Sequence, residues 1–157
     1  MRLDQKYKTL FAKNGLNTKL RISHFLAQIE HESAGFKHLK EIGNDTYFKK
    51  YEGRKDLGNN QTGDGLKYKG RGYIQITGRA NYTELSKDLG IDFVNNPQLL
   101  EQEVNAILSA LWYWNKRGLN KFADANDIKA ITKRINGGFN GLADREAKFK
   151  KWFNLIQ

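Results

Sequence analysis

The stretch GDGLKYKGRGYIQITGRANY, residues 63–82, is rich in glycine in its first half and less so in its second half. Its first half ends a segment, residues 53–72, that contains six glycines and no helical period. The sequence therefore predicts a long loop there, with a short β-hairpin into residues 73–77. A loop of this length inside a compact domain is usually either functional or disordered.

Apolar residues recur at helical spacing on both sides of this loop. A helix over residues 19–33 follows from four apolar residues at i, i+3, i+4 and i+7 after a capping threonine, Thr18. A long apolar pattern over residues 99–116, begun by Asn96-Pro97, predicts the central buried helix. Further helices are predicted over residues 4–12, 79–89, 128–136 and 142–155. The predicted fold class is mainly α, with a small β or loop lobe beside a helical core.

Length and composition narrow the class of protein. The chain has 157 residues and one proline, without a repeat or a low-complexity tract, which predicts a single domain over residues 1–157. It has no cysteine, no apolar run of about 18 residues and no apolar segment near its N-terminus. We therefore expect no disulfide, no membrane span and no signal peptide, with folding in a reducing cytoplasm.

The net charge of +10 favours an anionic partner. Nucleic acid, an anionic membrane surface and an anionic polymer such as a bacterial cell wall all fit that charge, and so does a merely soluble basic surface. The sequence shows no helix-turn-helix and no RNA-recognition signature, so no nucleic acid partner is expected.

Carboxylates lie where the predicted helix over residues 19–33 ends, in the stretch AQIEHESAGF. On a helical wheel Glu32 falls on the rim of the apolar stripe. Partial burial and the negative helix end raise a carboxyl pKa there, which suits a general acid. A glutamate in that place can equally be solvated or paired with a lysine. Glycoside hydrolysis needs a second carboxylate or a group that positions water, and Glu41 and Glu52 are the candidates.

Four motifs occur in one order along the chain: HES at residues 31–33, the stretch at residues 63–82, INGG at residues 135–138 and DRE at residues 144–146. Together they resemble glycoside hydrolase family 19, the chitinase-type family with a lysozyme-like fold. Among its members the chain is most similar to small bacteriophage endolysins. The resemblance covers roughly residues 18–153, and it implies a lysozyme-like α+β fold.

This resemblance implies catalytic roles. Glu32, in HES, matches the acid that protonates the leaving glycosidic oxygen. The family inverts the anomeric carbon, so a second carboxylate activates water from the opposite face, about 6.5–9.5 Å away. The segment FKKYEGR resembles plant-type enzymes and points to Glu52, whereas FKHLKE resembles phage-type enzymes and points to Glu41, and the sequence leaves both open. Thr77, in QIT, matches a hydroxyl that holds the nucleophilic water.

The resemblance also implies contacts with the sugar chain. The residues expected to bind substrate are Tyr68, Tyr73, Gln75, Asn81, Asn136 and Arg145. Arg145 matches an arginine that organises the carboxylates, and an arginine near the base would keep its pKa low. The tyrosines could stack on sugar rings, as could Trp114, or they could be ordinary core aromatics. Asn136 could equally be a helix C-cap before Gly-Gly.

The expected function is that of a phage-type endolysin. It would hydrolyse the β-1,4 bond between N-acetylmuramic acid and N-acetylglucosamine in peptidoglycan, as a monomer and without a metal or cofactor. Plant-type chitinases commonly carry disulfides and extra loops that this chain lacks, which favours peptidoglycan over chitin. The alternatives are a chitinase, a lytic transglycosylase that leaves 1,6-anhydro ends, and a non-enzymatic basic wall-binding module.

An endolysin without a signal peptide is expected to stay in the host cytoplasm until a holin releases it to the wall. The helix predicted over residues 142–155 has lysines and an arginine beside Phe149, Trp152 and Phe153. A basic amphipathic helix of this kind can contact an anionic outer membrane or lipopolysaccharide.

Overall fold

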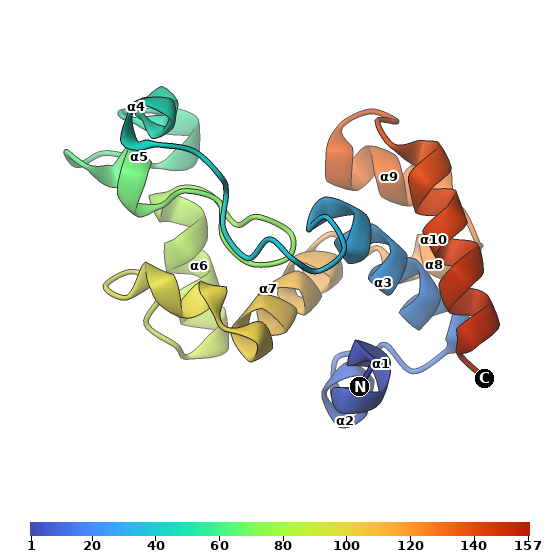
Figure 1. The fold of residues 1–157 in the computed structure, drawn as a ribbon. Coiled ribbons are helices and arrows are strands. Elements are labelled where there is room, and N and C mark those ends of the chain that lie inside the picture. The colour runs from blue at the N-terminus through green and yellow to red at the C-terminus, as the bar shows by residue number, and fades with distance from the viewer. The chain divides into compact units, whose positions relative to one another are not determined.

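The computed structural model describes all residues, Met1–Gln157, and its regular secondary structure is almost entirely helical (Figure 1). Residues 1–35 and 111–157 form one compact unit, which we call the terminal unit, and residues 36–110 form the other, the central unit. None of the helices combines the length and the apolar character that crossing a membrane requires.

The terminal unit is organised around α3. Its helices are α1 (Leu3–Lys6), α2 (Lys8–Lys13), α3 (Lys19–Glu32), the second half of α7 (Glu103–Lys116), α8 (Asn120–Asp124), α9 (Ile128–Asn136) and α10 (Leu142–Leu155). The backbone N–H of Arg21 donates to the side chain of Thr18, which caps α3 as predicted. Phe25 of α3 is fully buried and meets the rings of Phe11 and Trp114 edge-on at 5.5 Å each. The predicted apolar face of this helix is therefore the core of the unit.

The central unit is made of shorter elements. They are α4 (Asp45–Phe48), the 3-10 helices η1 (Lys49–Tyr51) and η2 (Lys55–Leu57), α5 (Asp64–Lys67), α6 (Arg79–Leu89), the 3-10 helix η3 (Pro97–Glu101) and the first half of α7. Its β structure consists of two isolated antiparallel bridges, Lys40 with Arg71 and Arg71 with Ile76. This is the small loop lobe that the sequence predicts, with very little strand in it.

The mainly helical fold class is confirmed, and three helices, α6, α9 and α10, have the predicted bounds. The helix predicted over residues 4–12 is instead two helices that meet at Tyr7. The helix predicted over residues 99–116 is interrupted at Gln102, where η3 ends and α7 follows. The loop over residues 53–72 contains η2 and α5, and the hairpin predicted after it is replaced by the isolated bridges.

Much of the motif at residues 63–82 builds the central unit. The Arg71 guanidinium is 7% exposed and donates to the Tyr82 hydroxyl at 3.0 Å and to the Glu101 carboxylate at 3.0 Å. Tyr82 donates in turn to the carbonyl oxygen of Lys69, and burial raises the pKa of its phenol far above the ordinary value. The arginine of the GRG pattern is therefore a structural residue.

Buried His24 makes the terminal unit sensitive to acid. Its ring stacks on Phe149 at 4.1 Å, Nε2 lies 2.7 Å from Asn126 Oδ1, and Nδ1 is buried without a partner. Burial lowers the pKa of His24, against the opposing effects of the Asn126 hydrogen bond and the Asp127 charge. Because the fold favours the neutral ring, stability is complete above the unfolded-state pKa of about 6.5 and is lost as the pH falls below it.

We therefore expect the free energy of unfolding to decrease between pH 7 and pH 5. The slope from this one proton is at most about 1.4 kcal/mol per pH unit. Urea unfolding at several pH values measures it, and the His24→Gln variant is expected to show a shallower slope. An equal slope in the variant would assign the acid sensitivity to other groups.

Candidate active site

The C-terminal end of α3 places Glu32 next to a buried arginine of α10. Arg145 is 1% exposed, and its Nη2 donates to Glu32 Oε1 at 2.7 Å. Its Nη1 donates to Gln28 Oε1 at 2.6 Å and its Nε to the carbonyl oxygen of Asn140 at 3.1 Å. The Glu32 side chain is 25% exposed. A carboxylate that solvent can reach is thus held in one direction by a guanidinium whose three nitrogens are all engaged.

A second contact joins the HES and DRE motifs. His31 Nδ1 lies 2.6 Å from Asp144 Oδ2, and Lys148 donates to both oxygens of the same carboxylate at 2.8 Å. Lys148 and then His31 lower the pKa of Asp144. Two adjacent residues of the HES motif on α3 therefore pair with two adjacent residues of the DRE motif on α10. Glu32 pairs with Arg145, and His31 pairs with Asp144.

Arg145, the residue expected to organise the carboxylates, contacts one of them, Glu32, the candidate acid. The lysine or solvent partner considered for Glu32 is replaced by this arginine. The reason is tertiary, since the packing of α10 on α3 decides which carboxylate the guanidinium meets.

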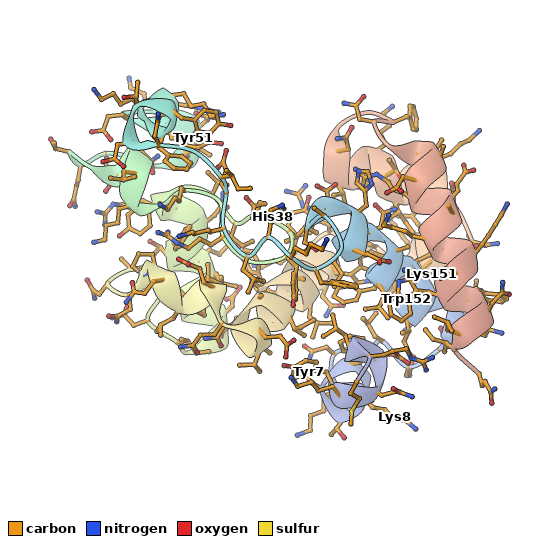
Figure 2. All side chains as sticks on the ribbon, in the orientation of Figure 1. Tyr7, Lys8, His38, Tyr51, Lys151 and Trp152 are labelled. Carbon is orange, nitrogen blue, oxygen red and sulfur yellow. The ribbon has the colours of Figure 1, made fainter.

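The lysines of α10 are largely engaged within the terminal unit. Lys151 and Trp152, which Figure 2 labels, both donate to the Glu30 carboxylate, at 2.7 and 2.9 Å. Lys148 is bonded to Asp144, and Trp152 is 5% exposed. The aromatic face of the predicted amphipathic helix therefore packs on α3, and Lys150 is the exposed lysine of this helix without such an ion pair.

Glu41 of the central unit lies among hydroxyl groups. The Tyr51 hydroxyl lies 2.8 Å from Oε2 and 3.0 Å from Oε1, and the Tyr47 hydroxyl donates to Oε2 at 3.1 Å. The backbone N–H of Gly70 donates to Oε1 at 3.3 Å, and Lys50 Nζ lies 3.8 Å from Oε2. The Glu41 side chain is 18% exposed. It is a partly exposed carboxylate supported from several directions.

Glu52 has a different setting. Its two oxygens accept the backbone N–H groups of Gly63 and Gly65, both at 2.9 Å, and these bonds lower the pKa of Glu52. A Cβ on Gly65 would lie 2.7 Å from the Glu52 backbone nitrogen, so glycine is required for this approach. Both oxygens are used to close the loop, which favours Glu41 of the two carboxylates that the sequence left open.

The Glu52→Gln variant is expected to lose stability and to keep its activity. Glutamine retains one acceptor oxygen, so one of the two loop contacts is lost. Because the pKa of Glu52 is lowered, its contribution is present above the unfolded-state pKa and disappears as the pH falls into the acid range. Hydrogen exchange at Gly63 and Gly65 should accelerate, more than in the Asp56→Asn control on the same loop. A large loss of kcat without faster exchange would return Glu52 to the catalytic candidates.

Three predicted residues form a chain of contacts at the start of α6. Thr77 Oγ1 donates to the carbonyl oxygen of Gln75 at 3.2 Å, and Asn81 Nδ2 donates to the carbonyl oxygen of Thr77 at 2.8 Å. Gln75 has a left-handed backbone, with φ of 59°, and its Nε2 donates to Gly72 O. A Cβ on Gly70 would lie 2.6 Å from Gln75 Oε1 and 3.2 Å from Glu41 Oε1. The structure thus brings Gln75 and Glu41 together around Gly70.

The predicted aromatic contacts are buried. Tyr68 is fully buried and donates to the carbonyl oxygen of Val94 at 2.8 Å, and Trp114 is fully buried with its Nε1 bonded to Asn120. Tyr73 is 3% exposed. Buried rings cannot stack on a sugar, so the core interpretation replaces the substrate role for all three. Asn136 is exposed at the end of α9 and accepts a hydrogen bond from the Asn140 backbone at 3.3 Å, which is a cap-like role.

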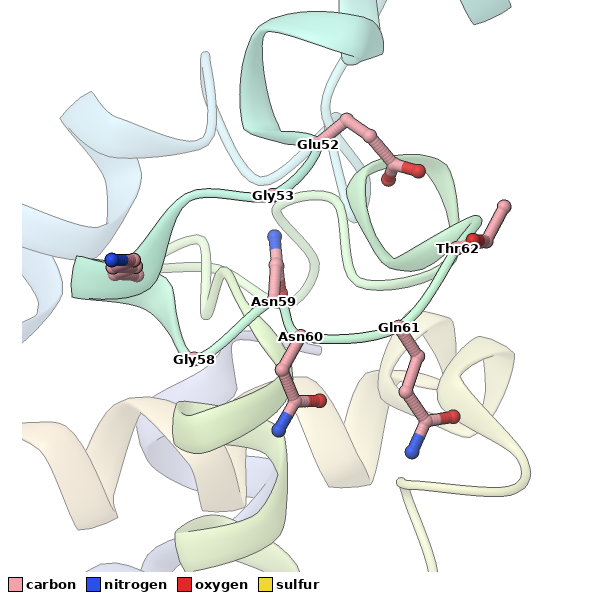
Figure 3. Close-up of a pocket in the computed structure, with 8 residues that line it drawn as sticks. Glu52, Gly53, Gly58, Asn59, Asn60, Gln61 and Thr62 are labelled. Carbon is pink, nitrogen blue, oxygen red and sulfur yellow. The ribbon is translucent and has the colours of Figure 1, made fainter.

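The loop of the central unit also borders an open pocket of about 580 Å³ (Figure 3). Its lining includes Glu52, Lys55, Asn60 and Gln61. Asn59, on its inner wall, donates to the Tyr51 carbonyl oxygen and accepts from the Arg79 backbone, so its amide holds the loop.

Sequence reasoning missed the partners of both carboxylates. Gln28 is four residues before Glu32 on α3, and a polar residue one turn away within an apolar face could have indicated a shared partner. Tyr47 and Tyr51 are also four residues apart, but nothing local links them to Glu41.

Known proteins resemble most of this chain in sequence. The family model of glycoside hydrolase family 19, described as chitinase class I, matches residues 8–148. A glycosyl hydrolase family 19 domain-containing protein of Haemophilus influenzae is 36% identical to this chain. The match covers 85% of this chain and 78% of the Haemophilus protein. An Arabidopsis thaliana endochitinase is 33% identical over 81% of this chain, which spans 43% of that protein.

Solved structures show the same fold. Chitinase C from Streptomyces griseus superposes with a TM-score of 0.71 at 26% identity, covering 87% of this chain and 59% of that one. The present chain therefore spans about three-fifths of this bacterial chitinase and less than half of the Arabidopsis relative.

Proposed function

The chain belongs to glycoside hydrolase family 19, and from that premise we propose that it hydrolyses β-1,4-linked N-acetylglucosamine polymers of the chitin type with inversion of the anomeric carbon. The relatives named as endochitinases and chitinases support this substrate class over peptidoglycan, which the sequence alone favoured.

The observation that carries the proposal is the pair of partly exposed carboxylates with contrasting partners. Glu32 is held by a buried guanidinium, and Glu41 is held by phenol hydroxyls and a backbone N–H. An inverting glycosidase needs one carboxylic acid and one carboxylate in different environments. We assign Glu32 as the general acid and Glu41 as the general base.

The proposed reaction balances with these two groups and water. In its reactive form Glu32 carries a proton on Oε2, because Oε1 accepts the hydrogen bond from Arg145 Nη2. It gives that proton to the glycosidic oxygen as the bond from that oxygen to the anomeric carbon breaks. Water attacks the anomeric carbon from the opposite face and loses a proton to Glu41. Thr77 is proposed to hold this water: its hydroxyl hydrogen is directed to the Gln75 carbonyl oxygen, which leaves lone pairs on Oγ1 to accept a hydrogen from water.

The test is hydrolysis of a chitin hexasaccharide, with the anomer of the fresh product read by NMR. An initial α-anomer, formed by wild type but not by Glu32→Gln, supports an inverting chitinase. A retained β-anomer would contradict the two-carboxylate assignment. No cleavage by active preparations of the full chain would contradict chitin as the substrate class.

Charge favours a second candidate function, hydrolysis of peptidoglycan by an endolysin. The terminal unit has sixteen Lys and Arg against seven Asp and Glu, a net charge of +9, whereas the central unit has eleven against ten, a net charge of +1. Chitin is neutral and gains nothing from this charge, but peptidoglycan carries peptide carboxylates. In this function the bond cleaved joins N-acetylmuramic acid to N-acetylglucosamine, after release of the enzyme from the host cytoplasm to the wall.

The basic surface of the terminal unit includes α8 and α9. Lys121 and Arg134, both exposed, each lie 5.1 Å from the centre of the Phe122 ring. We expect a Lys121→Gln/Arg134→Gln double variant to bind purified walls more weakly than wild type. The control is Lys49→Gln/Lys87→Gln, which removes the same charge from the central unit. An equal loss in both variants would assign binding to net charge alone.

Product mass distinguishes the rival activities on walls. Muropeptides that carry reduced N-acetylmuramic acid after borohydride treatment indicate a muramidase, and 1,6-anhydro ends indicate a lytic transglycosylase. Binding without any cleavage, by a preparation that also leaves chitin intact, would indicate a wall-binding module. Any contact of α10 with an anionic outer membrane would depend on Lys150 more than on Lys148 or Lys151, which are paired.

A further inference from the structure

We propose that Tyr51 is a positioning residue for Glu41, supported by Tyr47 and Lys50, and that this group of three side chains fixes the direction of the carboxylate. The inference rests on the proposed function, in which Glu41 accepts a proton from water. Tyr51 itself is not assigned a contact with the substrate. It acts through Glu41.

The position of Tyr51 is determined on three sides. Its ring stacks on buried Phe48 with the ring centres 6.5 Å apart. Its carbonyl oxygen accepts a hydrogen bond from Asn59 Nδ2 at 2.8 Å, and Asn59 is 2% exposed. Its hydroxyl lies 2.8 and 3.0 Å from the two oxygens of Glu41. Tyr51 is labelled on η1 in Figure 2. The backbone, the ring and the hydroxyl of Tyr51 are thus each held by a contact. A side chain held in this way is the rigid support that a functional group needs.

The hydroxyl of Tyr51 is a reliable donor. Burial and the hydrogen bond to Glu41 raise its pKa, so the phenol keeps its proton throughout the range in which a glycosidase works. A phenol has one hydrogen, and the two similar distances mean that both carboxylate oxygens share it. A shared donor opposes rotation of the carboxylate about its last bond.

A second line of support ends in a charge. Lys50 Nζ donates to the Tyr47 hydroxyl at 2.5 Å, and this bond raises the pKa of Lys50. The Tyr47 hydroxyl then donates to Glu41 Oε2 at 3.1 Å. Lys50 Nζ also lies 3.8 and 5.0 Å from the centres of the Tyr47 and Tyr51 rings. The Lys50 ammonium group is thus linked to the Glu41 carboxylate through the Tyr47 hydroxyl. It also lies against the Tyr47 and Tyr51 rings.

The number of donors leaves room for water. An ionised carboxylate has about four lone-pair sites. The hydroxyls of Tyr51 and Tyr47 and the N–H of Gly70 supply three hydrogens to them. These donors bring three hydrogens to about four lone-pair sites, so the carboxylate is one hydrogen short, and the proton of the attacking water can supply it.

The experiment compares Tyr51→Phe with Tyr68→Phe. Both changes remove one phenol hydroxyl in the central unit, but the Tyr68 hydroxyl bonds to a backbone carbonyl and lies in the core. With a chitin hexasaccharide, Tyr51→Phe is expected to lower kcat roughly 10- to 100-fold with little change in KM. Tyr68→Phe should lower the melting temperature and leave both quantities unchanged.

The Glu41→Gln variant distinguishes an error in the role of Tyr51 from an error in the role of Glu41. If Glu41→Gln is inactive and Tyr51→Phe has the wild-type kcat, the positioning role is wrong and the proposed function stands. If Glu41→Gln keeps wild-type activity, Glu41 is not the base, and both assignments fall. A loss of kcat in Tyr68→Phe as large as that in Tyr51→Phe would also overturn the proposal, because the effect would then be structural.

Discussion

Replacing Glu32 by glutamine is expected to lower kcat by about 10³-fold while the protein stays folded. Glutamine has no proton to give to the leaving oxygen, so general acid catalysis is lost. Its amide oxygen can still accept the hydrogen bond that Arg145 Nη2 donates to Oε1, so the contact between α3 and α10 survives. Hydrolysis of a chitin hexasaccharide measures the rate, and circular dichroism with a melting curve measures the fold.

Glu30 provides the matched control for this substitution. It lies two residues earlier on α3 and is bonded to Lys151 and Trp152. Glu30→Gln should reduce stability modestly and leave kcat unchanged. If Glu32→Gln retains the wild-type rate on every substrate that the protein cleaves, Glu32 is not the acid. If it is inactive because it is unfolded, as the melting curve would show, the structural account of Arg145 is wrong instead.

Replacing Arg145 by methionine should have the largest effect on stability. The guanidinium is 1% exposed and satisfies Glu32, Gln28 and the Asn140 carbonyl oxygen at once. Removing one partner of a buried ion pair costs about 3–5 kcal/mol, because the other charge is left uncompensated. That is a large part of the roughly 5–15 kcal/mol by which a domain is stable. Urea unfolding of the pure variant gives the difference directly.

The same change in the Glu32→Gln background tests the cause. Without the carboxylate charge, loss of Arg145 leaves only neutral acceptors unpaired, so the cost of Arg145→Met should be smaller there. Equal costs in both backgrounds would show that packing, and not the Glu32 charge, explains the effect. Arg145→Lys is expected to restore only part of the stability, since an ammonium group cannot reproduce the fork of three donor nitrogens.

Local signals in the sequence account for the best-predicted parts of the fold. Helix α9 has the predicted bounds because Asp127 caps its start, with its side chain accepting from Ala130, and Gly137 ends it at a φ of 85°. The break at Tyr7 was not predicted, because no glycine or proline at that position indicates one. Helix α5 was missed because its four residues are too few to show a period.

The candidate site could be predicted only where its signal is local in the sequence. The motif around Glu32 is local, but the partner that distinguishes it lies 113 residues away. The choice between Glu41 and Glu52 depends on where the N–H groups of Gly63 and Gly65 point, which no spacing in the sequence reveals. Tyr68 was expected to contact sugar because a buried ring and an exposed ring look alike in a sequence.

The terminal unit is assembled from two stretches of chain, and this has a consequence for synthesis on the ribosome. The central unit is one continuous segment, residues 36–110. It can therefore leave the ribosome and fold before α10 has been translated. Glu32 is made early and receives its arginine only 113 residues later. A nascent chain that ends before Arg145 therefore leaves the Glu32 carboxylate without the guanidinium that holds it.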